Sequence, residues 1–110
     1  MKSNHLRIYI ASPYRIGNIE LNVIISLEAS DKLMDLGHFP YAPLLAHFQN
    51  KLFPRPEADW MKLDLEYLRQ CDCVLRLHGK SVGADAEVTE AKRLGIPVYF
   101  GFEEFIKRSK

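Results

Sequence analysis

The 110-residue sequence lacks the features that mark secreted, membrane and nucleic-acid-binding proteins. No apolar run approaches the ~20 residues needed to cross a bilayer, and no secretory leader is expected at the N-terminus. The only cysteines are Cys71 and Cys73, whose spacing would strain a disulfide and is not that of a CxxC redox or zinc site, so two reduced, buried thiols are expected. The 15 basic and 14 acidic residues are interspersed, and the cluster Lys107, Arg108, Lys110 is interpreted as a solvated last helical turn. We therefore expect a cytoplasmic protein that binds neither membranes nor DNA or RNA polymers.

Several common catalytic motifs are also missing. There is no GxGxxG, Walker loop or GxSxG elbow, which argues against the usual dinucleotide, nucleoside triphosphate and α/β-hydrolase sites. The four histidines, at positions 5, 38, 47 and 78, show no HExxH or paired-ligand spacing, so no metal site is expected. His47 is instead a candidate for the wall of a ligand pocket.

Short apolar runs alternate with segments of helical spacing along the chain. Strands are expected over residues 6–11, 38–42, 73–77 and 98–100, and helices over 18–37, 57–70, 84–94 and 103–108, with 44–52 helical or irregular. This alternation implies right-handed crossovers and a parallel sheet covered on both faces. We expect one α/β domain over residues 1–110, a three-layer Rossmann-like or flavodoxin-like parallel sheet of four to five strands.

The loop after the first strand carries a concentration of polar groups. Ligands of such sheets bind outside the carboxyl ends of the strands, where the strand order reverses. Ser12, Tyr14, Arg15 and Gly17 offer a hydroxyl, a phenol, a guanidinium and a glycine just before a helix, a set that suits an anion. The alternative is that Gly17 and its neighbours are only turn and cap residues.

The loop after the third strand contains Ser81, Gly83 and Glu87 and leads into another helix. Gly83 permits close approach of a ligand to the backbone. Glu87 is placed in the first helical turn, where the helix dipole favours the ionised carboxylate, which can act as a nucleophile. Its alternative role is that of a helix stabiliser.

Asp64 interrupts a mostly apolar stripe. Helical spacing places it beside Trp60, Met61 and Leu68, on a face that is expected to point inward. Burial raises the pKa of a carboxyl, as a general acid requires, whereas pairing with an arginine would give Asp64 a purely structural role. Both roles remain open at this level.

Three segments, taken together, resemble the nucleoside 2-deoxyribosyltransferase superfamily. They are residues 8–15, Asp64 eight residues before Asp72, and Ser81-x-Gly83-x-x-x-Glu87 followed by Ala91 and residues 95–97. The resemblance spans nearly the whole chain, although residues 44–56 match nothing in that pattern. Within the superfamily the chain is most similar to small bacterial and phage members and to the 2'-deoxynucleoside 5'-phosphate N-hydrolases.

The resemblance implies roles for four residues. Glu87 matches the nucleophile that attacks the anomeric carbon, Tyr9 the phenol that orients it, and Asp64 the acid that helps the base depart. Transferases of the superfamily tend to carry aspartate where this chain has Ser81, so Ser81 favours a phosphorylated substrate. A homodimer or larger homo-oligomer is implied in the same way.

These inferences predict an N-glycosidase that hydrolyses the base–sugar bond of a nucleoside or deoxynucleoside 5'-monophosphate through a glycosyl intermediate on Glu87. Such chemistry needs no metal or organic cofactor. The alternatives are a non-catalytic nucleotide-binding or sensing module, a nucleoside deoxyribosyltransferase, and an NAD glycohydrolase similar to the TIR-type enzymes. The base and the choice between ribose and deoxyribose are left open.

Overall fold

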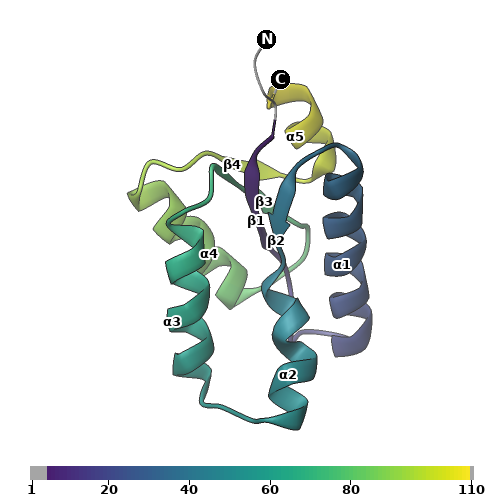
Figure 1. The fold of residues 1–110 in the computed structure, drawn as a ribbon, viewed down its shortest axis with the longest axis vertical. Helices are drawn as coiled ribbons and strands as arrows, with labels where there is room; N and C mark the ends of the chain where they lie inside the picture. The colour runs from purple at the N-terminus through teal and green to yellow at the C-terminus, as the bar shows by residue number, and fades with distance from the viewer. Residues whose placement is uncertain (1–4, 110) are drawn as a thin grey trace.

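A four-stranded, fully parallel sheet forms the centre of the computed structural model, which describes residues 5–109 (Figure 1). The strands are β1 (Arg7–Ala11), β2 (Phe39–Tyr41), β3 (Cys73–Arg76) and β4 (Val98–Phe100). Their order across the sheet is β2-β1-β3-β4, and every neighbouring pair is parallel. The predicted Rossmann-like α/β fold is therefore confirmed, with four strands.

The helices lie where the sequence pattern places them, within two residues at their starts. They are α1 (Ile19–Asp35), α2 (Ala46–Leu52), α3 (Glu57–Leu68), α4 (Val82–Arg93) and α5 (Phe102–Arg108), with a short 3₁₀ turn, η1 (Pro43–Leu45), before α2. Lys107 and Arg108 form the last turn of α5, while Lys110 lies outside the described residues. No helix among residues 5–109 is long and apolar enough to cross a membrane.

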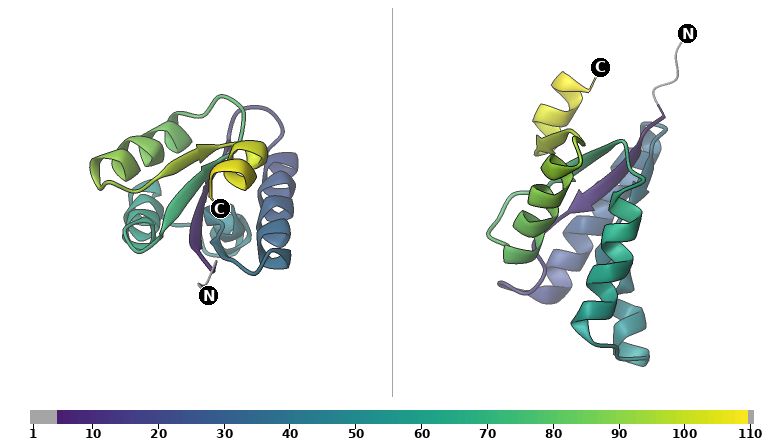
Figure 2. Two further views of the ribbon diagram at one scale, coloured as in Figure 1. Left: turned by 90° about the horizontal axis from the view of Figure 1, so that it is seen from above. Right: turned by 90° about the vertical axis from the view of Figure 1, so that its left-hand side faces the viewer.

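Alternating side chains of the central strands enter two separate cores. Ile8 and Ile10 of β1 pack with side chains of α1 and α5, whereas Tyr9 and Ala11 pack with side chains of α3 and α4. Successive residues of a strand point to opposite faces, so one apolar run can supply both cores. The result is three layers, with the sheet between two pairs of helices (Figure 2).

The two cysteines differ in burial. Cys73 is buried in β3, but Cys71, just before the strand, is only half-buried, so the expectation of two buried thiols is wrong for Cys71. Both are free, and burial raises the pKa of Cys71 to about 11 and that of Cys73 to about 12. Both side chains are therefore protonated thiols of low reactivity at neutral pH.

The strand order reverses beside β1. The chain leaves β1 for β2 at one side of it and then crosses to β3 at the other, so the loops that follow β1 and β3 diverge. This divergence opens a crevice at the carboxyl edge of the sheet. Both α2 and α3 extend beyond that edge of the sheet (Figures 1 and 2).

Candidate active site

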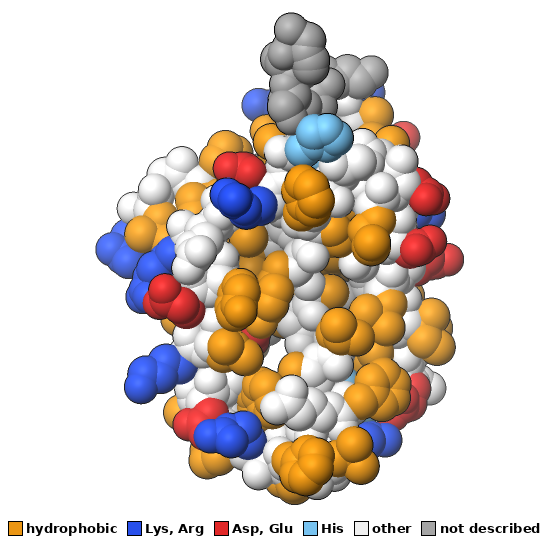
Figure 3. Space-filling model, in the orientation of Figure 1, with side chains coloured by type: hydrophobic (Ala, Val, Ile, Leu, Met, Phe, Trp, Pro, Cys, Tyr) orange, Lys and Arg blue, Asp and Glu red, His pale blue; other side chains and the backbone are white. Residues whose placement is uncertain are grey.

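A cavity of about 460 Å³ occupies the crevice at the carboxyl edge of the sheet. Its walls come from the loop after β1, the η1–α2 segment, α3 and the start of α4, and Figure 3 shows the surface hollowed between α3 and α2. The predicted site residues that line it are Ser12, Tyr14, Arg15, His47, Asp64, Ser81, Gly83 and Glu87. Segments far apart in the sequence thus meet around one space large enough for a small organic ligand.

Tyr9 lies behind the cavity rather than in its wall. Its side chain is completely buried on β1, and its hydroxyl donates a hydrogen bond of 2.5 Å to Oε2 of Glu87 on α4. Burial, followed by the negative charge of Glu87, raises the pKa of Tyr9 far above its usual value. Tyr9 therefore stays protonated and fixes one carboxylate oxygen of Glu87, leaving Oε1 for another partner.

Glu87 lies in the second turn of α4, not in the first, because the helix begins at Val82. The expectation that the helix dipole holds this carboxyl ionised is wrong: burial raises the pKa of Glu87 to about 7, and the nearby charge of Asp64 adds to the rise. The hydrogen bond from Tyr9 and the positive charge of Arg76 act in the opposite direction. Glu87 is thus a carboxyl that exchanges its proton near neutral pH.

Asp64 is half-buried on α3 and accepts a hydrogen bond of 3.0 Å from the hydroxyl of Tyr41, which ends β2. Burial raises the pKa of Asp64 to about 6, while the bond from Tyr41 lowers it. The Tyr41 ring stacks on that of Tyr67 with centroids 4.7 Å apart, which fixes the hydroxyl on Oδ1. Among the described residues Asp64 has no arginine partner. The alternative that Asp64 only forms a structural ion pair with an arginine is therefore wrong.

The bond from Tyr41 predicts a measurable change in Asp64. Tyr41→Phe removes a donor to the ionised carboxylate, so Asp64 should become about tenfold less acidic and its pKa should rise above 6. Carboxyl ¹³C NMR titration of the labelled protein measures this directly. Tyr67→Phe is the matched control, because it keeps the stacked ring and leaves Tyr41 bonded to Asp64; an equal change in both variants would contradict the role of Tyr41.

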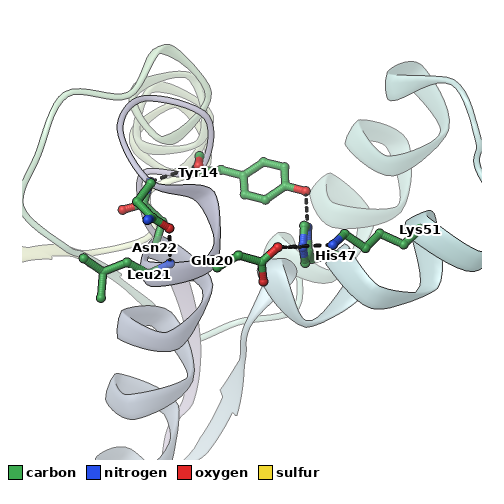
Figure 4. A network of polar contacts seen from close by, with 7 residues as sticks. Tyr14, Glu20, Leu21, Asn22, His47 and Lys51 are labelled. Carbon is green, nitrogen blue, oxygen red and sulfur yellow. Dashed lines mark hydrogen bonds and ion pairs between the residues drawn. The ribbon is translucent and has the colours of Figure 1, made fainter.

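A chain of polar contacts fastens the loop after β1 to α2 (Figure 4). The Tyr14 hydroxyl lies 2.7 Å from Nδ1 of His47, and Nε2 of His47 lies 3.1 Å from Oε2 of Glu20, which Lys51 also contacts at 3.2 Å. His47 is only 8% exposed and both of its ring nitrogens are engaged. Its imidazole therefore organises the wall of the cavity and has no nitrogen left for a ligand or a metal.

Arg15 and Gly17, expected to bind an anion, occupy different positions. Arg15 lies at the mouth of the cavity, where its guanidinium is 3.2 Å from Glu57 at the start of α3, both side chains being largely exposed. Exposed pairs of this kind are worth little, so Arg15 can exchange Glu57 for another anion. Gly17 is not among the described residues that line the cavity, and its φ of 88° shows that it serves the turn before α1.

The end of the cavity near the start of α4 is rich in hydrogen-bond donors. Ser81 caps α4 by accepting a bond of 3.0 Å from the Ala84 amide, which leaves its own O–H free to donate. Ser12 is 8% exposed, and its Oγ is buried without a partner among the described residues. Buried hydroxyls are rarely left unpaired, so an orphan in a cavity wall indicates a bound ligand or water. Lys80 adds a positive charge to the same wall.

Arg76 and Tyr41 were missed in the sequence, although both end a strand beside the cavity. Arg76 is 7% exposed; it donates to the carbonyls of Leu77 and Gly79 and to Asp85 on α4 at 2.9 Å. It thereby shapes the loop that carries Ser81. A charged residue within the apolar run 73–77 was the available signal, because a buried arginine needs several acceptors.

The described residues contain no group of three or more histidine, cysteine, aspartate or glutamate side chains placed to hold a metal ion. The side chains that line the cavity supply carboxyl groups, hydroxyls and cations. Two of these carboxyls, Glu87 and Asp64, have pKa values raised to about 7 and about 6. Perturbed carboxyls in a cleft are typical of enzyme active sites.

Fold and cavity together define a Rossmann-like α/β protein with a carboxyl-lined pocket at its topological switch point. The chain belongs to the family described as Domain of unknown function (DUF7768), whose model matches residues 6–101. None of the curated proteins matches it.

A solved structure is similar over most of the chain. It is that of a 2-deoxyribosyltransferase from the psychrotolerant bacterium Bacillus psychrosaccharolyticus, a biocatalyst for the synthesis of nucleosides. The two chains are 26% identical, with a TM-score of 0.65, and the similarity covers 86% of this chain and 70% of the other. This similarity supports the resemblance to the nucleoside 2-deoxyribosyltransferase superfamily and a chemistry of glycosyl transfer or hydrolysis at a coarse level.

Proposed function

We propose that this protein is an N-glycosidase that releases the base from a nucleoside or deoxynucleoside 5'-monophosphate. The observation that carries the proposal is the pair of carboxyls, Glu87 on α4 and Asp64 on α3, which line one cavity and titrate near neutral pH. Cleavage of an N-glycosidic bond requires one ionised carboxylate for the sugar and one proton donor for the base. The similar 2-deoxyribosyltransferase structure supports the same class of chemistry.

The first step forms a bond from Oε1 of Glu87, the oxygen that Tyr9 leaves free, to the anomeric carbon. The C–N bond breaks, its electron pair passes to the base nitrogen, and Asp64 donates its proton to the base. Water then attacks the anomeric carbon of the glycosyl ester and gives a proton to the Asp64 carboxylate. The products are free base, sugar 5-phosphate and regenerated Glu87.

A phosphate is the group that best suits the donor-rich end of the cavity. Ser12, whose buried hydroxyl has no partner among the described residues, Ser81, whose O–H is free to donate, and Lys80 all line the cavity together with the start of α4, where the first amides lack helical acceptors. Arg15 at the mouth can join them by leaving Glu57. These groups stabilise a dianion. With an unphosphorylated sugar bound, several of these donors would have no acceptor.

Ser81→Asp tests the phosphate assignment without disturbing α4, because aspartate caps a helix as well as serine does. The added carboxylate should repel the phosphate, so the preference for a monophosphate over its nucleoside should fall by about ten- to a hundredfold. The measurement is the ratio of base-release kcat/KM for the two substrates. Ser81→Asn, a neutral cap, is the control and should keep most of the preference; a native protein that cleaves both substrates equally well contradicts the assignment.

Transfer to an acceptor base is the second candidate, because the similar solved structure is a transferase. Water and a second base compete for the same glycosyl ester, so the test is to add a different free base at increasing concentration. Formation of a new nucleotide would establish transfer, whereas release of sugar phosphate alone would establish hydrolysis. Binding of nucleotides without release of any base would favour a non-catalytic nucleotide-binding module.

A second copy of this chain is the partner that we propose for the exposed apolar surface of α1 and α2. Leu21, Ile24 and Ile25 of α1 and Phe48 and Leu52 of α2 are all more than two-fifths exposed, and Figure 3 shows hydrophobic side chains gathered over these helices. Large exposed apolar patches mark interaction surfaces. Sedimentation equilibrium of the native chain measures the oligomer; a monomer at micromolar concentration would contradict the proposal.

A further inference from the structure

Asn50, on α2, lines the cavity with its amide in a fixed orientation. Its Oδ1 accepts hydrogen bonds from the Trp60 indole at 2.8 Å and from the backbone amide of Arg55 at 3.0 Å. Both partners are donors only, so Oδ1 cannot exchange places with Nδ2 without losing two hydrogen bonds. The two lone pairs of Oδ1 are used, and Asn50 can offer a ligand nothing but the N–H groups of Nδ2.

Those N–H groups are available to a ligand. Nδ2 has no hydrogen-bond partner among the described residues, yet it is not among their buried and unsatisfied side-chain atoms, so solvent reaches it. Trp60 and Asp64 are four residues apart on α3 and therefore share a face, with Trp60 about 6 Å farther along the helix axis from the sheet. Asn50, bonded to Trp60, thus lies in the outer part of the cavity on the Asp64 side.

We propose that Asn50 selects bases that carry a carbonyl group, rather than an amino group, at the edge farthest from the sugar. This inference rests on the proposed function, because it takes the Asp64 side of the cavity to hold the base and the Ser81 side to hold the phosphate. Asparagine reads adenine elsewhere with its oxygen on the amino group and its nitrogen on a ring acceptor. Asn50 cannot do so, since its oxygen is occupied.

The expected preference follows from matching donors to acceptors. Hypoxanthine, guanine, uracil and thymine present a carbonyl oxygen that can accept from Nδ2, whereas adenine and cytosine present an N–H₂ group that meets another donor. When the ligand buries Nδ2 against another donor, both groups lose their hydrogen bonds. The resulting loss of binding free energy is larger than that caused by a difference of one methylene group between substrates. The carbonyl bases should be favoured by about ten- to a hundredfold in kcat/KM.

Two pairs of substrates differ at this one position and make the test. They are deoxyinosine against deoxyadenosine 5'-monophosphate and deoxyuridine against deoxycytidine 5'-monophosphate. Asn50→Asp is nearly isosteric: it keeps the acceptor that binds Trp60 and Arg55 and replaces the donor with a second acceptor. The variant should reverse the preference in both pairs, because a carboxylate accepts from an exocyclic amino group. Gln49→Glu is the control; it adds the same charge one residue away, on an exposed position that is not among the described residues of the cavity wall.

Calorimetric binding of the same four nucleotides to Glu87→Gln separates this inference from the proposed catalysis. If the carbonyl nucleotides bind more tightly and Asn50→Asp reverses the order, the inference stands even where no base is released. Equal binding within each pair, or equal losses for all four nucleotides in Asn50→Asp, would overturn it while leaving the glycosidase proposal intact. No binding of any nucleotide would overturn both.

Discussion

Replacing Glu87 by glutamine should abolish base release while leaving the fold intact. The amide cannot form a glycosyl ester, and loss of a nucleophile costs on the order of 10⁴-fold or more in turnover. Glutamine still accepts the hydrogen bond from Tyr9 through its own oxygen, so the packing between β1 and α4 is kept. The measurement is kcat for release of free base, with nucleotide binding followed in parallel; near-native turnover would remove Glu87 from the mechanism.

The same variant should be more stable than the native protein at high pH. The folded protein raises the pKa of Glu87 from 4.5 to about 7, so between these values the folded state holds a proton that the unfolded chain releases. Stability contributed by this group is therefore lost as pH rises from about 4.5 to about 7. Glutamine has no such loss, and between pH 5 and pH 8 its free energy of unfolding should gain up to about 3 kcal/mol relative to the native protein. An enzyme that keeps a destabilising carboxyl in its cavity does so for chemistry rather than for the fold.

The sheet and the two converging loops could be predicted because they depend on local patterns. Apolar runs such as residues 6–11 and 73–77, each followed by a segment of helical spacing, predict alternating strands and helices. Right-handed crossovers make the strands parallel, so the loops that follow them lie at the same edge of the sheet. The positions of Ser12 and Ser81 in these two loops follow from the sequence pattern alone. The short strand Phe39–Tyr41 followed from the same reasoning.

The contacts that tune the site could not be predicted, because each joins residues far apart in the sequence. Tyr41 reaches Asp64 across 23 positions, and Tyr14 reaches His47 across 33. No periodicity within β2 or α3 indicates which hydroxyl meets which carboxyl. The error over the charge of Glu87 has the same origin: α4 begins two residues earlier than expected, which moves Glu87 into the second turn, and burial by other elements outweighs the helix dipole.

The two carboxyls impose a narrow pH range on the proposed reaction. Glu87, with a pKa of about 7, must be ionised to attack, while Asp64, with a pKa of about 6, must be protonated. The productive combination is a minor form, so activity should rise with pH up to about 6, peak near pH 6.5 and fall above about pH 7. If the two titrate independently, roughly one molecule in twenty has the productive combination near pH 6.5. Because each carboxylate opposes ionisation of the other, the two limbs of a bell-shaped kcat/KM profile belong to the pair.

Asp64→Asn should therefore change both the rate and the shape of that profile. Loss of the proton donor should lower kcat/KM by about 10²- to 10⁴-fold for ordinary bases, and much less for a 7-methylated purine, whose positive charge lets it depart without protonation. The falling limb above about pH 7 should disappear, because asparagine does not titrate, and the pKa of Glu87 should drop as the neighbouring negative charge is removed. Asp59→Asn is the control, since Asp59 lies on the same helix, is paired with Arg55 at the surface, and is not among the described residues that line the cavity. A merely structural Asp64 would depress both kinds of leaving base equally and leave the falling limb in place, and that result would assign the proton to another group.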